Sequence, residues 1–359
     1  MEKVKLGKIC EVFSGFAFKT FNEDKQGKPV IKIGNIQTDG KVSLEECSYT
    51  KEIPQEKYFS KINDIYIALS GATTGKVGIM KQRDFLINQR VGVIRLTNQN
   101  IPINYLFYFL KNKTVTILQD AFGAAQPNIS PKDILNYEIP LPSLEEQKAI
   151  AGKLDKVSEL IEKRKTQLEK LDLLIKSRFI ELFGDYKVNN KGFACKKGAE
   201  LFKFSSGKFL PEEKRLADGV PVYGGNGVAW YTSEYLVDYP TVIIGRVGAQ
   251  CGNIHAVTTP VWITDNAIYI KEQKTNAYTL EFLTELMRMM DFYQYADFSG
   301  QPKITQKPLE TLDYIIPPIE IQKEYTAFVE QVDKSKFEIQ KSLEKLEILK
   351  KSLMQQYFG

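Results

Sequence analysis

Two long charged stretches of the chain, residues 142–184 and 317–359, carry apolar residues in alternating steps of three and four. In each stretch eight of ten such positions are apolar, and Arg or Lys occupies the other two. A sustained spacing of about 3.5 residues with charged flanks is typical of a coiled-coil seam. The pattern therefore predicts two long helices with a pairing seam on each. The seam residues are Leu154, Val157, Ile161, Leu168, Leu171 and Ile175 in the first helix and Val329, Val332, Ile339, Leu343, Leu346 and Leu353 in the second.

The two predicted helices are suited to pairing with each other. A continuous helix over Glu145–Phe183 would be about 58 Å long, and its apolar stripe needs a cover. Arg164 and Arg178 interrupt the first seam. Lys336 and Lys350 interrupt the second seam at other places, which is compatible with one pairing register because polar seam residues specify alignment. The alternative is an amphipathic helix packed on its own domain. We prefer intramolecular pairing, and a pseudo-twofold relation between the two halves would make it antiparallel.

The rest of the chain alternates short β-type runs with Gly and Asn. Such runs are VIKIGNI, DIYIAL and VGVIRL in the first part and VPVYGG, TVIIG and AIYIK in the second. Each part also has a helical signal, near residues 104–112 and 279–292. The predicted fold class is α+β, with two tandem mixed α/β globules separated by two long helices that form an antiparallel coiled coil. The predicted domains are residues 1–141 and 185–316 for the globules and residues 142–184 and 317–359 for the helices.

This order of elements is an internal repeat. Gln147 and Gln322 lie 175 positions apart, and the same offset relates QPNIS at 126–130 to QPKIT at 301–305. It holds without a gap from Gln126 to Gly184, where Phe183-Gly184 matches the Phe-Gly at 358–359. Upstream the likeness is looser: DIYIALSGATTGKVGI resembles YPTVIIGRVGAQCGNI, and Gly34-Asn35 resembles the Gly-Asn at 225–226. Each half is therefore a divergent globule followed by a well-preserved helix.

Composition limits the classes of protein that fit. The 359 residues, 43% hydrophobic and 26% charged, can bury a sizeable core. The formal net charge of +5 permits an anionic partner such as DNA without requiring one. The four cysteines lie in no CxxC pair, so neither a disulfide framework nor a zinc site is indicated. Apolar runs are too short to cross a bilayer, and we expect a cytoplasmic protein without a membrane partner.

No catalytic motif is complete. GATTGKV at 71–77 is one residue short of a phosphate loop and lacks Ser or Thr after Lys76. GGNGVAW at 224–230 lacks the third glycine of a dinucleotide fingerprint. His255 and Cys251 supply two metal ligands where a structural site needs four. The sequence therefore predicts no catalytic residue, no bound cofactor and no metal in this chain.

Glycine-rich loops of the globules instead carry side chains suited to reading DNA. Arg, Lys, Asn and Gln recognise guanine and adenine edges in the major groove, and Gly lets the backbone approach phosphates. The simpler interpretation, which holds for many single residues, is that Gly and Asn only build turns. The candidate DNA-binding residues are Lys76, Gln89 and Arg90 in the first globule and Arg246, Gln250 and Asn266 in the second.

The whole pattern resembles the DNA-specificity subunit of type I restriction-modification enzymes. The resemblance rests on IPLPSLEEQKAIAGKLD at 139–155 and its echo IIPPIEIQKEYTAFVEQVD at 315–333, with QPNISPKDI, QPKITQKPL, GRVGAQCGNIH and TDNAIYI in support. It implies that each globule is a target recognition domain that reads one half of a split double-stranded DNA sequence. One departure is ALSG at 68–71 where the second globule has GRVG at 245–248, which makes equivalent contacts doubtful there.

The resemblance also implies partners. The paired helices would hold the two domains apart and dock two modification subunits that bind S-adenosylmethionine and methylate adenine. Restriction subunits that use ATP and Mg would join them, and this chain would be non-catalytic. Two alternatives stay open on the residues alone: an independent DNA-binding nuclease or methyltransferase, and a coiled-coil scaffold with no DNA role. The DNA sequence, its spacer and the register of the helix pair are not fixed by the sequence.

Overall fold

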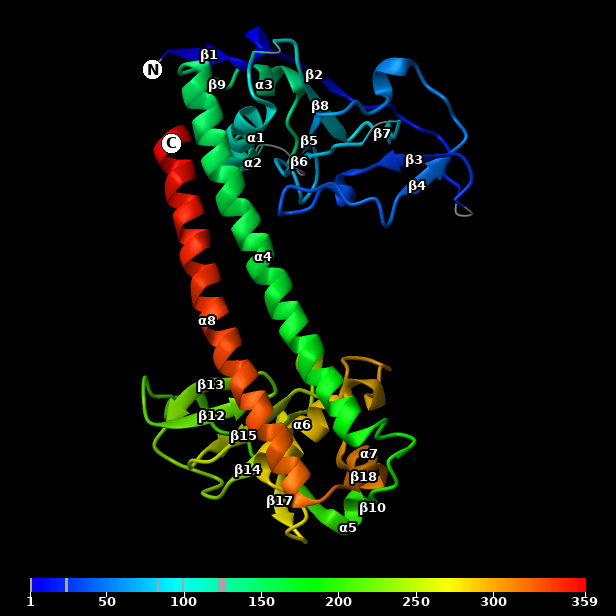
Figure 1. Cartoon of the computed structure of the whole chain (residues 1–359), viewed down its shortest axis with the longest axis vertical. Coiled ribbons are helices and arrows are strands. Elements are labelled where there is room, and N and C mark those ends of the chain that lie inside the picture. Colours follow the sequence, from blue (N-terminus) through cyan, green and yellow to red (C-terminus); the bar gives the residue numbers. More distant parts are fainter. Residues whose placement is uncertain (1, 23–24, 83, 99, 122–126) are drawn as a thin grey trace. The chain divides into compact units, whose positions relative to one another are not determined.

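The computed structural model describes residues 2–22, 25–82, 84–98, 100–121 and 127–359. Gln126, the first residue of the QPNIS motif, lies outside these residues. The chain divides into two compact units, Met1–Lys165 with Lys341–Gly359 and Thr166–Gln340. Each unit contains one globule and a part of both long helices, α4 (Leu144–Phe183) and α8 (Ile319–Phe358) (Figure 1).

Both long helices begin in the same way, which explains why the chain repeats one phrase. Each follows a proline-containing segment, and a buried glutamine five residues after a proline turns back to it. Gln147 Nε2 donates to the Pro142 carbonyl at 2.8 Å, and Gln322 Nε2 donates to the Pro317 carbonyl at 2.8 Å. Carbonyls just outside a helix are thereby satisfied where water has no access. The repeated proline and glutamine therefore fix how each helix leaves its globule.

The first unit is built on an antiparallel four-stranded sheet in the order β2-β8-β5-β6. A three-stranded sheet, β4-β3-β7, and a two-stranded sheet, β1-β9, complete its strands. The strands are β1 Lys3–Lys5, β2 Cys10–Ser14, β3 Lys28–Ile31, β4 Ser48–Thr50, β5 Ile65–Ala68, β6 Val77–Ile79, β7 Leu86–Ile87, β8 Val91–Leu96 and β9 Glu138–Pro140. Helices α1 Ile103–Asn112, α2 Thr114–Asp120 and α3 Pro131–Leu135, with 3-10 turns η1 Leu6–Lys8, η2 Ile33–Asn35 and η3 Glu56–Tyr58, connect them.

The second unit repeats this arrangement strand for strand. Its sheets have the orders β11-β17-β14-β15, β13-β12-β16 and β10-β18. The strands are β10 Ala194–Lys197, β11 Phe202–Ser206, β12 Val220–Gly224, β13 Gly227–Thr232, β14 Thr241–Gly245, β15 Ile254–Val257, β16 Trp262–Ile263, β17 Ala267–Gln273 and β18 Asp313–Ile316. The shorter helices are α5 Gly198–Leu201, α6 Leu280–Met290 and α7 Gln306–Thr311, and the 3-10 turns are η4 Glu212–Lys214, η5 Gly248–Gln250 and η6 Phe292–Tyr295.

A fully buried central strand separates two hydrophobic cores in each globule. In β5, Ile65 and Ile67 face a core shared with α1 and the long helices, whereas Tyr66 and Ala68 face a smaller core toward β7. Successive side chains of a strand point to opposite faces, so both faces of this sheet are covered. β14 has the same burial, which is why DIYIAL and TVIIG read as continuous apolar runs.

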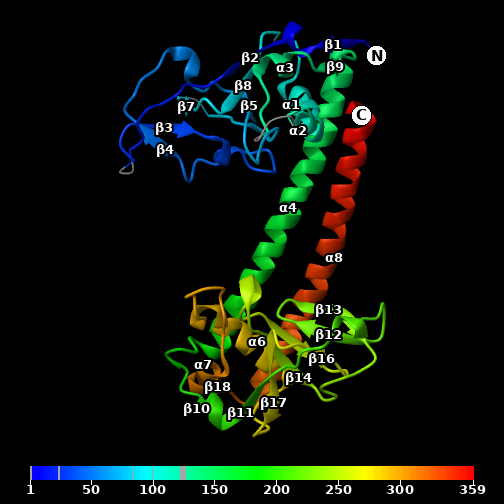
Figure 2. The ribbon, with the colours of Figure 1, turned by 180° about the vertical axis from the view of Figure 1, so that it is seen from behind.

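Within each unit the long helices run antiparallel. In the first unit Leu154, near the start of α4, shares a core with Met354 and Phe358 at the end of α8. Figures 1 and 2 both show these two helix ends side by side next to α1. In the second unit Phe183, at the end of α4, packs 5.4 Å from Tyr325 near the start of α8. Each long helix thus begins on its own globule and ends in the core of the other unit.

The predicted seam lies inward, because all twelve of its residues are buried or half-buried. Its polar interruptions are ion-paired in the second unit: Lys336 lies 2.7 Å from Asp172, and Arg178 lies 2.5 Å from Glu324. Both pairs join α4 to α8. From Asp172 to Arg178 along α4, the partner on α8 changes from Lys336 back to Glu324, so the helices run in opposite directions. The predicted α+β fold with an internal repeat and antiparallel helices is confirmed at the level of each unit.

One detail of the predicted repeat holds in place but not in conformation, because both Gly-Asn dipeptides follow the equivalent strand, β3 or β12. Gly34-Asn35 and the Gly-Asn at 225–226 were matched by sequence, but they occupy different structures. Asn35 ends the 3-10 turn η2, where its side-chain oxygen accepts from the Lys32 amide at 2.8 Å. Residues 225–226 form the tight connection between β12 and β13. Gly-Asn favours turns of several kinds, so the two dipeptides form different turns after equivalent strands.

Candidate nucleic-acid interface

The loops that join the central strands have the same backbone hydrogen bonds in both units. The first loop, residues 69–76, closes when Gly75 N donates to Ala68 O at 2.9 Å. The second, residues 246–253, closes when Gly252 N donates to Gly245 O at 2.8 Å. We call these the strand loops. Their shared geometry was visible in the sequence as the likeness of SGATTGK to RVGAQCGN.

The proline of each QP motif is hydrogen-bonded to its strand loop. Gly71 N donates to Pro127 O at 3.1 Å, and Gly248 N donates to Pro302 O at 2.8 Å. Gly71 and Gly248 have φ values of +86° and +79°, a region that favours glycine over residues with a Cβ. The gapless repeat of QPNIS and QPKIT therefore reflects a conserved support for the two loops.

A third segment completes each cluster. The loop before β8 carries Arg90, whose carbonyl accepts from Leu69 N at 2.9 Å. The loop before β17 carries Asn266, whose carbonyl accepts from Arg246 N at 2.9 Å. We call three segments together the reading cluster of each unit. They are the strand loop, the segment that begins at Pro127 or Pro302, and this third segment. The two clusters share a backbone frame and differ in side chains.

The structure brings the candidate residues of the first globule into one reading cluster. Lys76 ends the strand loop and is half-buried, and its carbonyl accepts from Ala68 N at 2.9 Å. Gln89 and Arg90 are exposed on the third segment. Gln89 N donates to Phe16 O at 2.9 Å, so this segment is held by the backbone and its side chains extend outward. Their contact with DNA stays a prediction.

The candidates of the second globule lie together in the same way. Arg246 is half-buried, and its Nη1 donates to the Asp265 carbonyl at 3.2 Å. Gln250 and Asn266 are exposed, and Gln250 Oε1 accepts from the Asn253 side chain. The backbone bonds show that Arg246 has the position in the second cluster that Leu69 has in the first. The expected absence of an equivalent arginine in the first cluster therefore holds in space as well as in sequence.

The candidate residues chosen from the sequence did not include every residue that shapes these clusters. Asn253 occupies the place of Lys76, because its carbonyl accepts from Gly245 N as that of Lys76 accepts from Ala68 N. Gly15 and Gly207 lie so close to the neighbouring strand that a Cβ there would meet a carbonyl oxygen at 2.3 Å and 2.1 Å. The Ser-Gly dipeptide that precedes both Phe16 and Lys208 was the sequence signal for this close approach between neighbouring strands.

Exposed aromatic residues occur in both globules. Phe209 and Phe298 are 72% and 54% exposed, and Phe298 packs 5.2 Å from Tyr293. In the first unit Lys32 Nζ lies 3.7 Å from the centre of the Phe21 ring. Exposed aromatic rings beside cations are common in surfaces that contact nucleic acids.

His255 lies beside the second cluster in β15. Burial lowers the pKa of His255, opposed by a hydrogen bond with the Gly225 backbone, so its imidazole is neutral at pH 7. Its Nε2 has no hydrogen-bond partner among the described residues. Across residues 2–359 apart from the masked positions 23–24, 83, 99 and 122–126, no group of three or more potential metal ligands occurs. In the same part of the chain, no helix combines the length and the apolarity needed to span a bilayer.

Two equivalent loop clusters on two repeated globules, joined by long paired helices, define a protein with two similar recognition domains. A family model for the type I restriction modification DNA specificity domain matches residues 1–172 and 190–350. The chain therefore belongs to the type I restriction-modification DNA specificity family.

Individual relatives agree with this assignment. The type I restriction enzyme MjaVIII specificity subunit of Methanocaldococcus jannaschii is 35% identical over 205 residues, a match that spans only about half of each protein: 54% of this chain and 48% of the relative. The EcoprrI specificity subunit of Escherichia coli is 24% identical over 329 residues, which cover 85% of this chain and 80% of that protein. The S subunit of a type I restriction-modification system from M. genitalium shares the fold, with a TM-score of 0.64 at 20% identity, over 100% of this chain and 96% of that one.

Proposed function

We propose that this chain is the non-catalytic specificity subunit of a type I restriction-modification system and binds a bipartite, asymmetric DNA sequence. The observation that carries the proposal is the pair of reading clusters, which share backbone hydrogen bonds but not side chains. Two readers on one frame with different side chains are what recognition of two unlike half-sites requires. Each half-site would be read by one globule.

The side chains suggest how each cluster would read DNA. Arginine donates two parallel hydrogen bonds to guanine O6 and N7, and asparagine or glutamine pairs with adenine N6 and N7. The second cluster offers Arg246, Gln250 and Asn266, whereas the first offers Arg90, Gln89 and Lys76. Lysine acts as a point charge on phosphates as well as on bases. We expect Arg246 and the long side chains of the third segments to contact base edges, and the glycines of the strand loops to let the protein backbone approach DNA phosphates.

The long helices would set the gap between the half-sites. A helix of about 58 Å corresponds to roughly 17 base pairs as an upper bound on the separation. Once one globule is bound, the second searches a small volume, which raises its effective concentration. Spacing along the DNA then becomes part of specificity, as it does for dimeric DNA-binding proteins.

The helices also carry surfaces suited to partner subunits. Leu173 and Leu174 are 60% and 46% exposed in the second unit, and Ile348 and Leu349 are 70% and 46% exposed in the first. These two pairs are equivalent in the repeat and lie outside the seam. Exposed apolar groups at matching positions fit two copies of one partner, which we take to be two modification subunits.

Chemistry would belong to those partners. The modification subunits would bind S-adenosylmethionine and methylate adenine, and restriction subunits would use ATP and Mg. The test is to purify the chain with its modification partner and methylate a plasmid. Adenine methylation at one split motif is expected, and methylation at no defined motif would refute the proposal. The chain alone, given DNA, Mg and S-adenosylmethionine, should neither cut nor methylate, because those reactions reside in the partners.

A further inference from the structure

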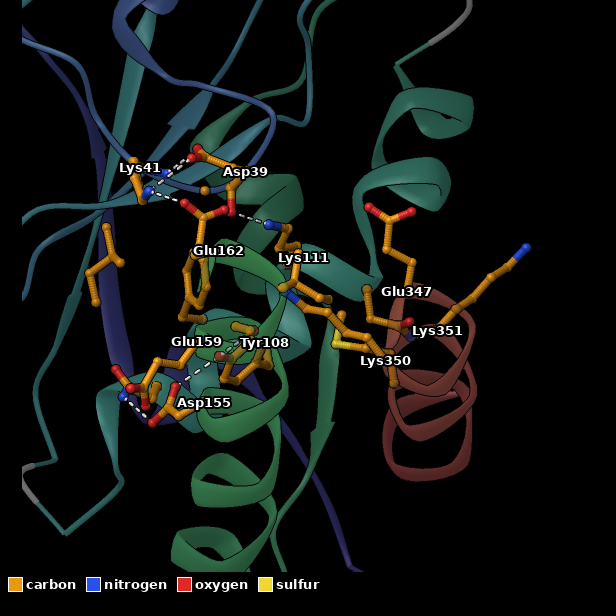
Figure 3. A pocket seen from close by; sticks show the side chains of 18 of the residues that line it. Asp39, Lys41, Tyr108, Lys111, Asp155, Glu159, Glu162, Glu347, Lys350 and Lys351 are labelled. Carbon is orange, nitrogen blue, oxygen red and sulfur yellow. Dashed lines mark hydrogen bonds and ion pairs between the residues drawn. The ribbon is translucent and has the colours of Figure 1, made fainter. Parts of the chain in front are cut away.

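A lysine-lined pocket of about 1060 Å³ lies in the first unit, outside the reading cluster. It is enclosed by α1, the first half of α4, the last turns of α8 and the loop at residues 39–41. Figure 3 shows Lys111 from α1 and Lys350 from α8 among the side chains around this space. Both residues lie in the same unit, so the pocket is a feature of one compact body.

The acidic residues of the pocket already have partners. Glu162 accepts from Lys41 at 2.5 Å, and Asp155 accepts from Tyr108 at 2.8 Å and from Asn104 at 2.7 Å. The other three acids lie near lysines of their own: Asp39 with Lys41 at 3.5 Å, Glu159 with Lys163 at 2.7 Å and Glu347 with Lys165 at 3.8 Å. Four of these five acids thus lie beside a lysine other than Lys111 and Lys350, and Asp155 is hydrogen-bonded to two neutral side chains.

Lys111 and Lys350 are not paired in this way. Among the described residues neither has an ion pair with a carboxylate; Lys111 donates to the Asp39 carbonyl, and Lys350 lies 5.8 Å from the centre of the Tyr108 ring. Burial, and then the neighbouring charge of Lys350, lower the pKa of Lys111 to about 8. Burial also lowers the pKa of Lys350. Asp39 and Glu162 offset part of the positive charge of these two lysines without forming an ion pair with either. Two ammonium groups close together in one partly dry space still favour an added anion.

At the equivalent place in the second unit, Arg288 and Lys336 are each paired with a carboxylate. Helices α1 and α6 correspond, so Arg288 takes the place of Lys111, and it pairs with Glu285. Ile175 takes the place of Lys350. Lys336, which is the repeat equivalent of Ile161, pairs with Asp172 at 2.7 Å. The repeat therefore supplies its own control, with a charge-balanced site in one unit and two unpaired lysines in the other.

Apolar side chains form the rest of the pocket. Phe107, Tyr108, Ile161 and Met354 line it beside the lysines. A ligand site of this size commonly combines an apolar wall with a few polar groups that fix orientation. We propose that this pocket binds a phosphate-bearing ligand, with its phosphoryl oxygens between Lys111 and Lys350 and a flat apolar body against Phe107 and Met354.

Binding would couple to protonation. A phosphate dianion stabilises the charged form of Lys111, so ligand binding near pH 8 should take up protons. The charged groups that face Lys111 are known for every surrounding element. They are Asp39, Lys41 and Lys81 from loops, Lys113 directly after α1, Asp155, Glu159, Glu162 and Lys165 from α4, and Glu347, Lys350 and Lys351 from α8. Since burial lowers the pKa of both Lys111 and Lys350, these two lysines are the groups expected to titrate.

The test is calorimetric titration of the intact chain with pyrophosphate and with AMP at pH 7 and pH 8. We expect saturable binding, tighter for AMP if the apolar wall contributes, with net proton uptake at pH 8. Affinity should fall about tenfold or more in Lys111→Met and in Lys350→Met, because each removes a charge-assisted donor. The matched control is Arg288→Met in the second unit, which should bind as the unaltered chain does.

A competition experiment between pyrophosphate and duplex DNA shows whether the pocket takes a DNA phosphate or a free ligand. Displacement of pyrophosphate by a DNA duplex would mean that the pocket takes a backbone phosphate, and no displacement would mean a free ligand. The proposal is overturned if neither probe binds, or if sodium chloride of equal ionic strength reproduces the effect. It is also overturned if both lysine variants bind normally, or if they lose only the modification partner, since the pocket would then hold an acidic protein segment. Because Lys111 and Lys350 are both half-buried, circular dichroism and the melting temperature of each variant show that it is folded before its affinity is compared.

Discussion

Arg246 and Leu69 occupy the same place in the two reading clusters, yet only Arg246 can donate to a base. We predict that Arg246→Ala changes the recognised sequence in one half-site and leaves the other half unchanged. Loss of a bidentate contact costs about 1–3 kcal/mol of discrimination against the wrong base. Sequencing of methylated sites in a host with this chain and its partner measures both halves at once. Relaxation of both halves would mean that Arg246 supports the fold or holds phosphate instead.

Gln322 allows a sharper test of what holds a long helix to its globule. It is fully buried; its Nε2 donates to Ala277 O and Pro317 O, and its Oε1 accepts from Thr279 N at 3.0 Å. Gln322→Ala leaves these groups without partners, at a cost of about 1–3 kcal/mol for each group that stays dry.

Gln147 is the matched control for that substitution. It makes the bond to Pro142, but its Oε1 has no partner among the described residues. Gln147→Ala should therefore lower the free energy of unfolding by less than Gln322→Ala does. Urea denaturation, followed separately for each unit by hydrogen exchange, compares the two. Equal losses would show that the extra bonds of Gln322 are not what stabilises the second helix start.

Lys111 gives the stability of the first unit a definite pH dependence. Its pKa is about 8 in the folded chain and 10.5 in the absence of burial. Between pH 8 and pH 10.5 the unfolded chain binds more protons at Lys111 than the folded chain does, so stability rises with pH in this range. Below pH 8 the buried side chain is charged and lowers the free energy of unfolding. In the absence of ligand, Lys111→Met should raise the melting temperature at pH 7, and this gain should shrink by pH 10. A gain independent of pH would mean that Lys111 is not buried in its charged form.

The sequence predicted where the loops lie but not which side chains occupy equivalent positions in them. The glycine pattern located both strand loops, since positive φ at Gly71 and Gly248 requires such residues. It could not show that Asn253 replaces Lys76, because that depends on backbone hydrogen bonds between segments far apart in the chain. Nor could it show that Lys111 and Lys350, more than two hundred positions apart, face one pocket.

At the scale of elements, the helices were the most predictable part. The seam spacing placed both long helices, and their observed bounds, Leu144–Phe183 and Ile319–Phe358, follow the predicted prolines closely. The apolar runs of the central strands were also recognisable. Pairings such as β1 with β9 and β10 with β18 join strands more than one hundred residues apart and leave no local signature.

Helix length should control the gap between half-sites. We predict that one heptad inserted into both α4 and α8 near residues 165 and 340 lengthens the unread spacer by about 3 base pairs, since seven residues add about 10.5 Å. A heptad keeps the seam in phase. The control is the same insertion in α4 alone, which should disturb pairing and weaken methylation. An unchanged spacer in the double insertion would show that the helices do not set the distance.

At the scale of the whole molecule, the repeat predicts two partner sites. Leu173→Lys with Leu174→Lys should remove one modification subunit from the complex, and the same change at Ile348 and Leu349 should remove the other. Charged groups at the centre of an apolar contact are strongly unfavourable. Leu160 is the control, being 44% exposed on α4 with Ser335 at the equivalent place. Native mass spectrometry counts the subunits, and two copies retained in every variant would contradict these docking positions.

The central claim is that two unlike reading clusters on one repeated frame recognise two halves of one DNA sequence. Its most direct test is single-molecule sequencing of methylated adenines in a host that carries the chain and its modification partner, with the first globule exchanged for a second copy of residues 185–316. We predict one split asymmetric motif for the natural chain and a symmetric split motif, built from its second half-site, for the exchanged chain. An exchanged chain that keeps the original motif, or a natural motif without a gap, would contradict the account.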